Sequence, residues 1–250
     1  MTATETPPVL DGYQGYTEWK RWQGSFATSR GEARNFAAEF RGIPLAGKRV
    51  LEIGFGEGHF MAWARAGGAT VEGIEINPEM LAAASAQGYV ARNARLDELA
   101  SAGAAYDVIV AFDVLEHWNQ DELVANFRAI ATLLRPDGHF LARFPNGHSP
   151  FGRVYQYGDF SHRSVLSCFK IDYLAMLSGL EVTRMADAVR LPSRPDPLRA
   201  LRYYWRAWRR RRIERMIAHL YGTARLPLAP NLVVVLRKPA PGQQPARLRC

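Results

Sequence analysis

The hydrophobic residues of this chain change their spacing in a regular order. Short, mostly apolar runs with the composition of buried strands lie at residues 49–53, 70–76, 89–92, 106–112 and 139–144. Segments with the apolar spacing of helices follow three of them, at residues 59–66, 78–87 and 121–134. Alternating strands and helices build a parallel sheet with helices on both faces and the ligand at the carboxyl ends of the strands. The pattern therefore predicts an α/β fold with a doubly wound sheet.

The alternation stops after residue 145. A loop rich in glycine, serine, tyrosine and histidine extends to residue 164 and precedes a predicted helix at residues 171–178. Two further apolar runs, at residues 180–185 and 232–236, predict strands with no ordinary crossover helix between them. Because parallel neighbours need such a crossover, we expect these last strands to pair antiparallel at the sheet edge.

One substantial core with attachments is the expected domain organisation of the 250 residues. The first attachment is an aromatic-rich extension at residues 1–47, whose second half has the spacing of an amphipathic helix. The predicted core covers residues 48–190, and its loop at 145–164 is a candidate acceptor loop because long loops often carry function. The remaining segments are a basic insertion at residues 191–228, a final core strand at 229–238 and a tail at 239–250.

Composition argues against several classes of protein. The longest apolar runs have the length of strands, and the first 30 residues contain no apolar segment of a signal peptide, so we expect a cytoplasmic protein. The two cysteines, Cys168 and Cys250, lie in no CxxC or Cys/His pattern, and neither a disulfide framework nor a zinc site is predicted. No metal-ligand cluster is evident in the sequence, although scattered carboxylates can assemble one in space.

A glycine-rich motif follows the first predicted strand. Gly54, Gly56 and Gly58 alternate at the turn into a helix, and Glu75 stands at the end of the second strand. Glycines let backbone amides approach a ligand closely, and a later carboxylate accepts hydrogen bonds from ribose hydroxyls. The NAD fingerprint G-x-G-x-x-G requires its third glycine at the position of His59. The motif therefore predicts a nucleotide site, and the mismatch argues against NAD.

Four motifs resemble those of class I S-adenosylmethionine (SAM) dependent methyltransferases. They are residues 52–58 (EIGFGEG), 73–77 (GIEIN), 111–117 (AFDVLEH) and 133–139 (LLRPDGH). The resemblance covers residues 49–144 in the expected order and spacing. It implies a Rossmann-like, doubly wound sheet of seven strands, mostly parallel with an antiparallel C-terminal edge strand. It also implies SAM as the cofactor.

The same resemblance implies which residues hold the cofactor. The three glycines would line its methionine and ribose, Glu52 would lie near its amino group, and Glu75 would accept both ribose hydroxyls. Ile76 would pack on the adenine, and Asn93 or a neighbour would meet the adenine edge, where the family often has an aspartate. The full set of expected cofactor-binding residues is Glu52, Gly54, Gly56, Gly58, Glu75, Ile76, Asn93, Ala94 and Asp113.

Methyl transfer to a hydroxyl requires alignment of the acceptor with the methyl group and sulfur, and the hydroxyl must lose its proton. His117, after the fourth predicted strand, and His162, in the loop, are candidate bases, and Asp113 is the third catalytic candidate. Each has a structural alternative. His117 can pack on a neighbouring ring, Asp113 can bond the backbone of its own turn, and Asp159 can pair with His162 simply to order the loop.

Shorter motifs bear on the acceptor. Residues 15–20 (GYTEWK), 144–150 (FPNGHSP) and 157–162 (YGDFSH) are similar to segments of methyltransferases associated with bacterial cell-surface polysaccharide synthesis. This similarity implies O-methylation of a sugar hydroxyl, on a glycan or a lipid-linked glycan precursor. The alternative acceptor is a small phenol or quinone precursor. A membrane-associated protein that kept the fold but lost catalysis is the rival from another class, although the intact glycines and Glu75 argue against it.

Aromatic residues in the N-terminal extension are candidates for a lid over the site. Tyr16 and Trp19 are the two that we single out, because aromatic faces attract cations such as a sulfonium. Packing in the core is the alternative for these rings.

Positive charge is concentrated in one segment. Nine arginines and two acids lie between residues 194 and 215, so this segment holds an excess of seven of the net charge of +8. Residues 198–221 have the composition of a helix drawn to an anionic membrane surface, with Leu201, Tyr204, Trp205 and Trp208 on one face. Four arginines at 209–212 interrupt that face, which leaves a solvated insertion or an oligomer contact as the alternative.

Nucleic acid is the least favoured partner for this charge. Base N-methyltransferases carry an Asn/Asp-Pro-Pro-aromatic motif after the fourth strand, where this chain has residues 113–116 (DVLE). The basic segment therefore has no matching chemistry for a base.

Overall fold

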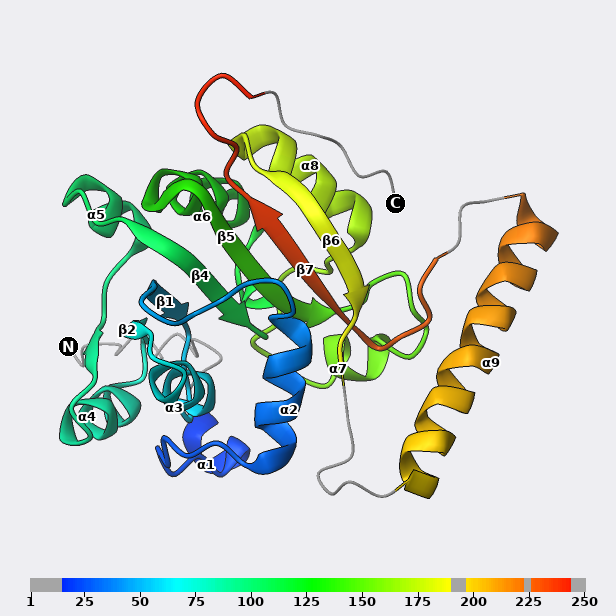
Figure 1. The fold of residues 1–250 in the computed structure, drawn as a ribbon, viewed down its shortest axis with the longest axis horizontal. Coiled ribbons are helices and arrows are strands. Elements are labelled where there is room, and N and C mark those ends of the chain that lie inside the picture. The colour runs from blue at the N-terminus through cyan, green and yellow to red at the C-terminus, as the bar shows by residue number, and fades with distance from the viewer. Residues whose placement is uncertain (1–14, 190–196, 223–225, 244–250) are drawn as a thin grey trace, which may run out of the picture.

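The computed structural model describes residues 15–189, 197–222 and 226–243 (Figure 1). These residues form a seven-stranded sheet in the order β3-β2-β1-β4-β5-β7-β6. The strands are β1 (Arg49–Ile53), β2 (Thr70–Ile74), β3 (Val90–Arg92), β4 (Tyr106–Phe112), β5 (Leu134–Pro145), β6 (Glu181–Asp187) and β7 (Asn231–Arg237). Strands β1 to β5 pair parallel, which confirms the predicted Rossmann-like fold class.

The antiparallel part of the sheet differs from the prediction in one detail. Strand β7 runs antiparallel to both β5 and β6 and lies between them, so β6 forms the sheet edge. Six of the seven residues of β7 are buried, whereas only two of the seven residues of β6 are buried. The continuous apolar run at residues 232–236 suits an interior position because such a strand is covered on both faces.

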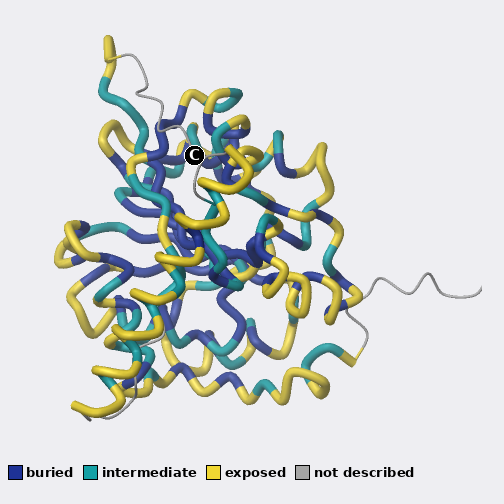
Figure 2. The backbone as a smooth tube through the Cα atoms, turned by 90° about the vertical axis from the view of Figure 1, so that its right-hand side faces the viewer, coloured by how far each residue is buried: buried dark blue, intermediate teal, exposed yellow. Residues whose placement is uncertain are grey.

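Helices cover both faces of the sheet (Figure 1). One face packs against α2 (Arg30–Glu39), α3 (His59–Ala66) and α4 (Pro78–Ala86). The other face packs against α5 (Leu96–Ser101), α6 (Gln120–Leu133) and α8 (Cys168–Ser178). Figure 2 shows much of the buried backbone gathered along the middle of the molecule. The three-layer arrangement leaves the carboxyl ends of the parallel strands as the place for a site.

Several helix starts follow from capping side chains. The Asn119 side chain accepts a hydrogen bond from the Glu122 amide at 2.9 Å, and the Glu122 carboxylate accepts one from the Asn119 amide at 2.8 Å. This capping box fixes the start of α6. Asn77 caps α4 through its side-chain oxygen, which accepts hydrogen bonds from the amides of Glu79 and Met80, and Pro78 lies in the first turn.

Two local features were not expected from periodicity. Helix α5 has six residues, too few to show a helical repeat. Residues 135–138 (RPDG), whose composition favours a turn, lie within the bounds of β5, where Asp137 has a φ of 60° and the pairing with β4 changes register between Tyr106 and Val108. This segment therefore forms an irregularity within the strand.

Short helical segments accompany the chain near the carboxyl ends of the strands. Helix α1 (Tyr16–Lys20) lies in the N-terminal extension, and a 3-10 turn, η1 (Leu115–His117), follows β4. Helix α7 (Arg153–Tyr157) interrupts the loop at residues 145–164, which was expected to be irregular.

Helix α9 (Pro197–Tyr221) stands at the side of the molecule in Figure 1. Glu214 is its one buried side chain and accepts a hydrogen bond from the Leu228 amide at 2.8 Å. Arg210 forms an ion pair with Asp187 of β6. These contacts tie one side of α9 to the core. Among the described residues, no helix combines the length and the apolar character of a membrane span.

The division into segments remains a prediction. The boundary expected at residues 190–191 and the last seven residues of the predicted tail, 244–250, lie outside the described residues.

Candidate active site

The glycine turn after β1 has a backbone that favours glycine. Gly54 has a φ of 64°, and a Cβ built on it would lie 2.7 Å from a methyl group of Val114. Gly58 has a φ of 69°, and its Cβ would lie 2.2 Å from the Phe26 ring. Both the left-handed backbone and the close packing therefore exclude larger residues.

Glu75 links the end of β2 to this turn. Its carboxylate accepts hydrogen bonds from the amide of Gly56 at 3.0 Å, of Ile76 at 2.8 Å and of Asn77 at 3.1 Å. A carboxylate offers about four lone-pair positions, so roughly one remains for a further donor. These hydrogen bonds hold the Glu75 side chain in place at the cavity, where its carboxylate can accept roughly one more hydrogen bond.

Glu52 is a buried carboxyl in the same region. Burial raises the pKa of Glu52 well above its usual value, and the nearby Glu75 carboxylate adds to the effect. Its Oε2 atom is buried without a hydrogen-bond partner among the described residues. A cationic group brought beside Glu52 would satisfy this oxygen and favour the ionised form.

A cavity of about 1300 Å³ opens over these residues. The expected site residues that line it are Glu52, Gly54, Gly56, Glu75, Ile76, Ala94, Asp113 and His117. Three expected residues do not line it. Gly58 packs against Phe26, Asn93 is exposed while Ala94 and Arg95 face the cavity, and His162 lies behind His117.

The N-terminal extension covers part of the cavity. Tyr16 lines it and stacks edge-on with Trp22, their ring centroids 5.4 Å apart. Trp22 itself lies against the position of a Gly56 Cβ, at 3.1 Å. Trp19 is 57% exposed and is not a lining residue. Of the two expected lid residues, only Tyr16 lines the cavity. Trp22, rather than Trp19, is the second aromatic residue of the extension that lines it.

Asp113 follows β4 with a φ of 56°, which is unusual for a residue other than glycine. Its Oδ2 atom accepts a hydrogen bond from Nη2 of Arg143 at 2.6 Å, and Nε of Arg143 lies 3.1 Å away. Arg143 lines the cavity as well. The aspartate therefore enters the site as half of an ion pair.

A histidine cluster lies at the end of the cavity beside η1. The rings of His117 and His162 are edge-on with centroids 4.7 Å apart, and the Tyr16 ring lies 6.4 Å from that of His117. Asp159 accepts a hydrogen bond from the Tyr16 hydroxyl at 3.1 Å and pairs with Lys20 at 3.2 Å. These contacts bring the N-terminal extension and the loop at residues 145–164 together at one end of the cavity.

Both imidazoles of the cluster favour their neutral form. Burial, with the His162 ring beside it, lowers the pKa of His117 to about 4. Burial also lowers the pKa of His162, although Asp159 opposes the change. For Asp159, burial acts to raise the pKa, but hydrogen bonds from Ser161 and the Lys20 ammonium outweigh it and lower the value to about 2.

A family model described as a methyltransferase domain matches residues 27–215 of this chain. The chain belongs to this methyltransferase family. The match contains the glycine turn, Glu75 and the histidine cluster, so it includes most of the residues that line the cavity. Tyr16, Lys20, Trp22 and Asn231 line the cavity from outside the matched range.

Curated relatives of this methyltransferase match over part of their length. A ubiquinone biosynthesis O-methyltransferase of Ralstonia nicotianae is 35% identical over 103 residues, which are 38% of this chain and 42% of the relative. The protein of the same name from Thiobacillus denitrificans is 32% identical over 151 residues, 57% of this chain and 64% of the relative. A probable SAM-dependent methyltransferase of Mycolicibacterium smegmatis is 34% identical over 55% of this chain and 53% of its own. The chain thus spans less than two thirds of each of these relatives.

Solved structures share the fold of this methyltransferase. The CcbJ methyltransferase of Streptomyces caelestis superposes with a TM-score of 0.60 at 18% identity, over 93% of this chain and 99% of that one. The magnesium protoporphyrin IX methyltransferase of Synechocystis, with bound SAM, gives 0.57 at 14% identity over 94% and 100%. At these identities the likeness concerns the fold.

SAM is the cofactor of this methyltransferase, and the cavity residues fit it. The buried Glu52 carboxyl, with its unpartnered oxygen, suits the ammonium of a methionine moiety. Glu75 retains acceptor capacity for a ribose hydroxyl, and Ile76, 56% exposed at the cavity, offers an apolar surface to a base. The glycine turn leaves the space that a Cβ would fill.

Sequence reasoning missed several lining residues. Trp22 and Lys20 reach the cavity from the extension, and Arg143 reaches it from β5. Glu116, which does not line the cavity, lies beside the two histidines and was missed as well. The motif at residues 111–117 contains Glu116 beside His117, which was the available signal for it. The contacts of Trp22 and Lys20 depend on long-range packing and had no local signal.

Proposed function

We propose that this methyltransferase transfers the methyl group to a hydroxyl oxygen of a small phenolic acceptor, of the kind found in quinone precursors. The observation that carries the proposal is the His117 ring, which lines the cavity with His162 edge-on behind it. Neutral imidazoles beside aromatic side chains can accept the proton that an acceptor hydroxyl must lose. The names of the Ralstonia and Thiobacillus relatives support a phenolic acceptor.

Bound SAM supplies a methyl group on a positively charged sulfur, which the acceptor oxygen displaces as its hydroxyl loses a proton. The residues of this chain orient the two partners. Glu52 and Glu75 hold the polar ends of the cofactor, and the glycine turn lets the backbone approach it. The acceptor hydroxyl lies against His117, with His162 behind it, and loses its proton there.

Aromatic side chains support a phenolic ring as the acceptor. Tyr16, Trp22 and Trp118 line the same cavity, and Lys20 lies over the Tyr16 ring at 5.1 Å. Flat apolar walls of this kind bind an aromatic ring through burial and stacking. The salt bridge between Lys20 and Asp159 and the hydrogen bond between Tyr16 and Asp159 hold these walls in place.

The sugar acceptor expected from the shorter motifs stays a prediction. Tyr157, in one of those motifs, is 69% exposed and lines a separate hollow beside His148 and Arg153. Asp159 of the same motif points its carboxylate at Tyr16 and Lys20. These contacts order the loop, and neither Tyr157 nor Asp159 lines the main cavity.

A transfer assay tests the acceptor. The purified full chain is incubated with SAM and separate panels of catechols and hydroxybenzoates, and of sugars and lipid-linked oligosaccharides, and methylated products are identified by mass spectrometry. We expect methyl ethers of phenols, and their loss in His117→Ala but not in His139→Ala. His139 pairs with Val108 of β4, away from the carboxyl ends of the strands, and is the matched control. Methylation of sugars alone would overturn the phenolic proposal.

We also propose that α9 binds an anionic membrane surface, which would bring the enzyme to a lipid-soluble acceptor. Its exposed side chains include Leu201, Tyr204, Trp205 and Trp208. Arg209 lies over the Trp205 ring at 4.7 Å, so cationic and aromatic groups share the same surface. Such a surface gains from both apolar burial and attraction to anionic lipid.

A further inference from the structure

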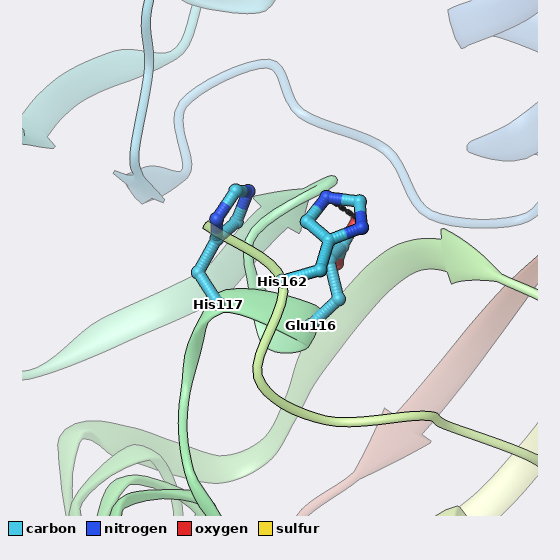
Figure 3. A group of neighbouring side chains, drawn as sticks. All are labelled: Glu116, His117 and His162. Carbon is cyan, nitrogen blue, oxygen red and sulfur yellow. Dashed lines mark ion pairs between the residues drawn. The ribbon is translucent and has the colours of Figure 1, made fainter. Parts of the chain in front are cut away.

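We propose that Glu116, His117 and His162 form a binding site for a divalent transition-metal ion at the acceptor end of the cavity. Each residue offers one ligand atom, and the three atoms lie within 4.8 Å of one another. Figure 3 shows the two imidazoles side by side, with the Glu116 carboxylate next to His162. The inference rests on the proposed hydroxyl acceptor for its role, while the site itself rests on these side chains.

The backbone brings the three residues together from two segments. Glu116 and His117 lie in η1, directly after β4. The carbonyl oxygen of Glu116 accepts hydrogen bonds from the amides of Arg163 at 2.8 Å and Ser164 at 3.0 Å. These bonds hold the loop beside η1 and fix His162 against the other two ligands. Preformed placement of this kind is what a metal site needs from its protein.

The Glu116 carboxyl gives an independent reason to expect a cation. Its side chain is 1% exposed, and its Oε2 atom has no hydrogen-bond partner among the described residues. The other oxygen, Oε1, lies 3.9 Å from Nε2 of His162. An unsatisfied buried carboxyl is costly, and coordination of a cation removes that cost.

The hydrogen bonding of His162 leaves the correct nitrogen for a metal. Its Nδ1 atom lies 3.1 Å from the carbonyl oxygen of Gln156, which holds a proton on Nδ1. Nε2 then carries the free electron pair that can bind a metal. It lies 3.9 Å from Oε1 of Glu116 and 3.8 Å from Oδ2 of Asp159. A backbone carbonyl on the second nitrogen is the usual support of a metal-bound histidine.

Two imidazoles and one carboxylate select the kind of ion. This ligand set suits Zn²⁺, Co²⁺ or another first-row divalent ion, whereas Mg²⁺ prefers oxygen ligands alone. Bonds of 2.0–2.1 Å in a tetrahedral zinc site bring ligand atoms to roughly 3.3 Å from one another. The present separations are larger, so small side-chain rotations would complete the site.

Three protein ligands leave positions open on the ion. His117 lines the cavity, so an open position would face the bound acceptor. An acceptor hydroxyl bound there loses its proton more readily, because the ion draws charge from the oxygen. The O–H bond breaks, water takes the proton, and the oxygen keeps the electron pair. This pair forms the new bond to the methyl carbon, while the bond from that carbon to the sulfonium sulfur breaks and its electrons stay on the sulfur. In this form the two histidines act as ligands for the ion that activates the acceptor.

A metal titration tests the site without depending on activity. Tag-free, metal-free full chain is titrated with Co²⁺ and followed by its visible absorption, and Zn²⁺ and Mg²⁺ are then added as competitors. We expect one Co²⁺ per chain, displaced by Zn²⁺ and not by an equal amount of Mg²⁺. His162→Ala and Glu116→Gln should each weaken Co²⁺ binding by at least tenfold, while His139→Ala binds as the parent does.

SAM binding and circular dichroism, measured on each variant, show whether the variant is folded. Equal Co²⁺ affinity in the parent and in His162→Ala would overturn the site. If Glu116→Gln does not fold, His162→Ala alone decides the question. Co²⁺ binding by a parent enzyme that methylates no phenol would contradict the proposed acceptor and leave the metal site standing.

Discussion

The Glu75 carboxylate accepts a hydrogen bond from the amide of Gly56 at 3.0 Å, so the end of β2 is joined to the turn that follows β1. Both residues line the cavity. Because this hydrogen bond requires the amide of Gly56 to lie close to the Glu75 carboxylate, the turn at Gly56 and the side chain of Glu75 act as one structural unit. A change at either residue is therefore expected to reach the cofactor.

His117 is expected to serve the chemical step more than cofactor binding. In His117→Ala we expect kcat to fall by about 10²- to 10⁴-fold, the usual contribution of a group that assists proton removal. The Kd for SAM should stay within a factor of about two of the parent. Steady-state kinetics and calorimetry on the same preparation measure the two effects. A parent-like kcat in His117→Ala would remove this residue from the mechanism.

Glu57 ties the N-terminal extension over the cavity. Its carboxylate accepts hydrogen bonds from the amides of Gln23 and Gly24 and from the Ser25 hydroxyl. Glu57→Gln should weaken these bonds, raise the Kd for SAM by roughly tenfold, and expose the extension to proteases. Calorimetry and limited proteolysis measure the effect, with the exposed Glu79→Gln as the control. Unchanged protease sensitivity would show that this tether does not hold the extension.

Membrane binding by α9 predicts a dependence on both charge and tryptophan. The parent should sediment with phosphatidylglycerol vesicles and not with phosphatidylcholine vesicles, and added salt should weaken the binding. The double variant Trp205→Ala, Trp208→Ala should lose most of it. Trp19→Ala removes a similarly exposed tryptophan from α1 and serves as the control. Equal sedimentation of all three proteins would contradict the proposal.

Asp107 predicts an acid-sensitive part of the stability. Burial acts to raise its pKa, but hydrogen bonds from the Arg49 amide and the Arg135 side chain outweigh it and lower the pKa below the ordinary 3.8. A carboxyl whose pKa is lower in the folded protein than in the unfolded chain stabilises the fold at pH values above its unfolded pKa. This stabilisation is lost as the pH falls through the folded pKa. The Tm of Asp107→Asn should therefore lie below that of the parent at pH 6. The difference in Tm between the parent and Asp107→Asn should become smaller below pH 3.8. A gap that stays constant down to pH 3 would exclude this linkage.

The order of strands and helices could be predicted because each element has a local repeat. Residues 49–53 and 106–112 are continuous apolar runs, and Gly54, Gly56 and Gly58 mark the turn between strand and helix. The position of β7 inside the sheet was not predicted, although its continuous apolar run at residues 232–236 suits an interior strand. Strand order at an edge depends on which faces are covered, and that is settled by packing far along the chain.

The cofactor end of the site was largely accessible from the sequence, and the acceptor end was not. Glu75 and the glycines lie within one short stretch of motifs, whereas Tyr16 meets Asp159 across 143 positions of sequence. Glu116 is next to His117 in the sequence. It lies close to His162 only because the loop at residues 145–164 folds against η1. The possible metal ligands therefore had no spacing that a sequence could display.

The central claim is that the glycine turn and Glu75 together hold SAM, and calorimetric titration of SAM into Glu75→Ala and Gly56→Val tests it most directly. A Cβ at Gly56 would lie 3.1 Å from the Trp22 ring on a backbone with a φ of 47°. Loss of hydrogen bonds to a charged group is worth ~1.5–3 kcal/mol, so Glu75→Ala should bind SAM about 10- to 100-fold more weakly than the parent. Gly56→Val, whose side chain would crowd the Trp22 ring, should also bind SAM more weakly than the parent. The exposed Glu79→Ala should bind SAM as the parent does. Parent-like affinity in both Glu75→Ala and Gly56→Val, in folded protein, would contradict the account.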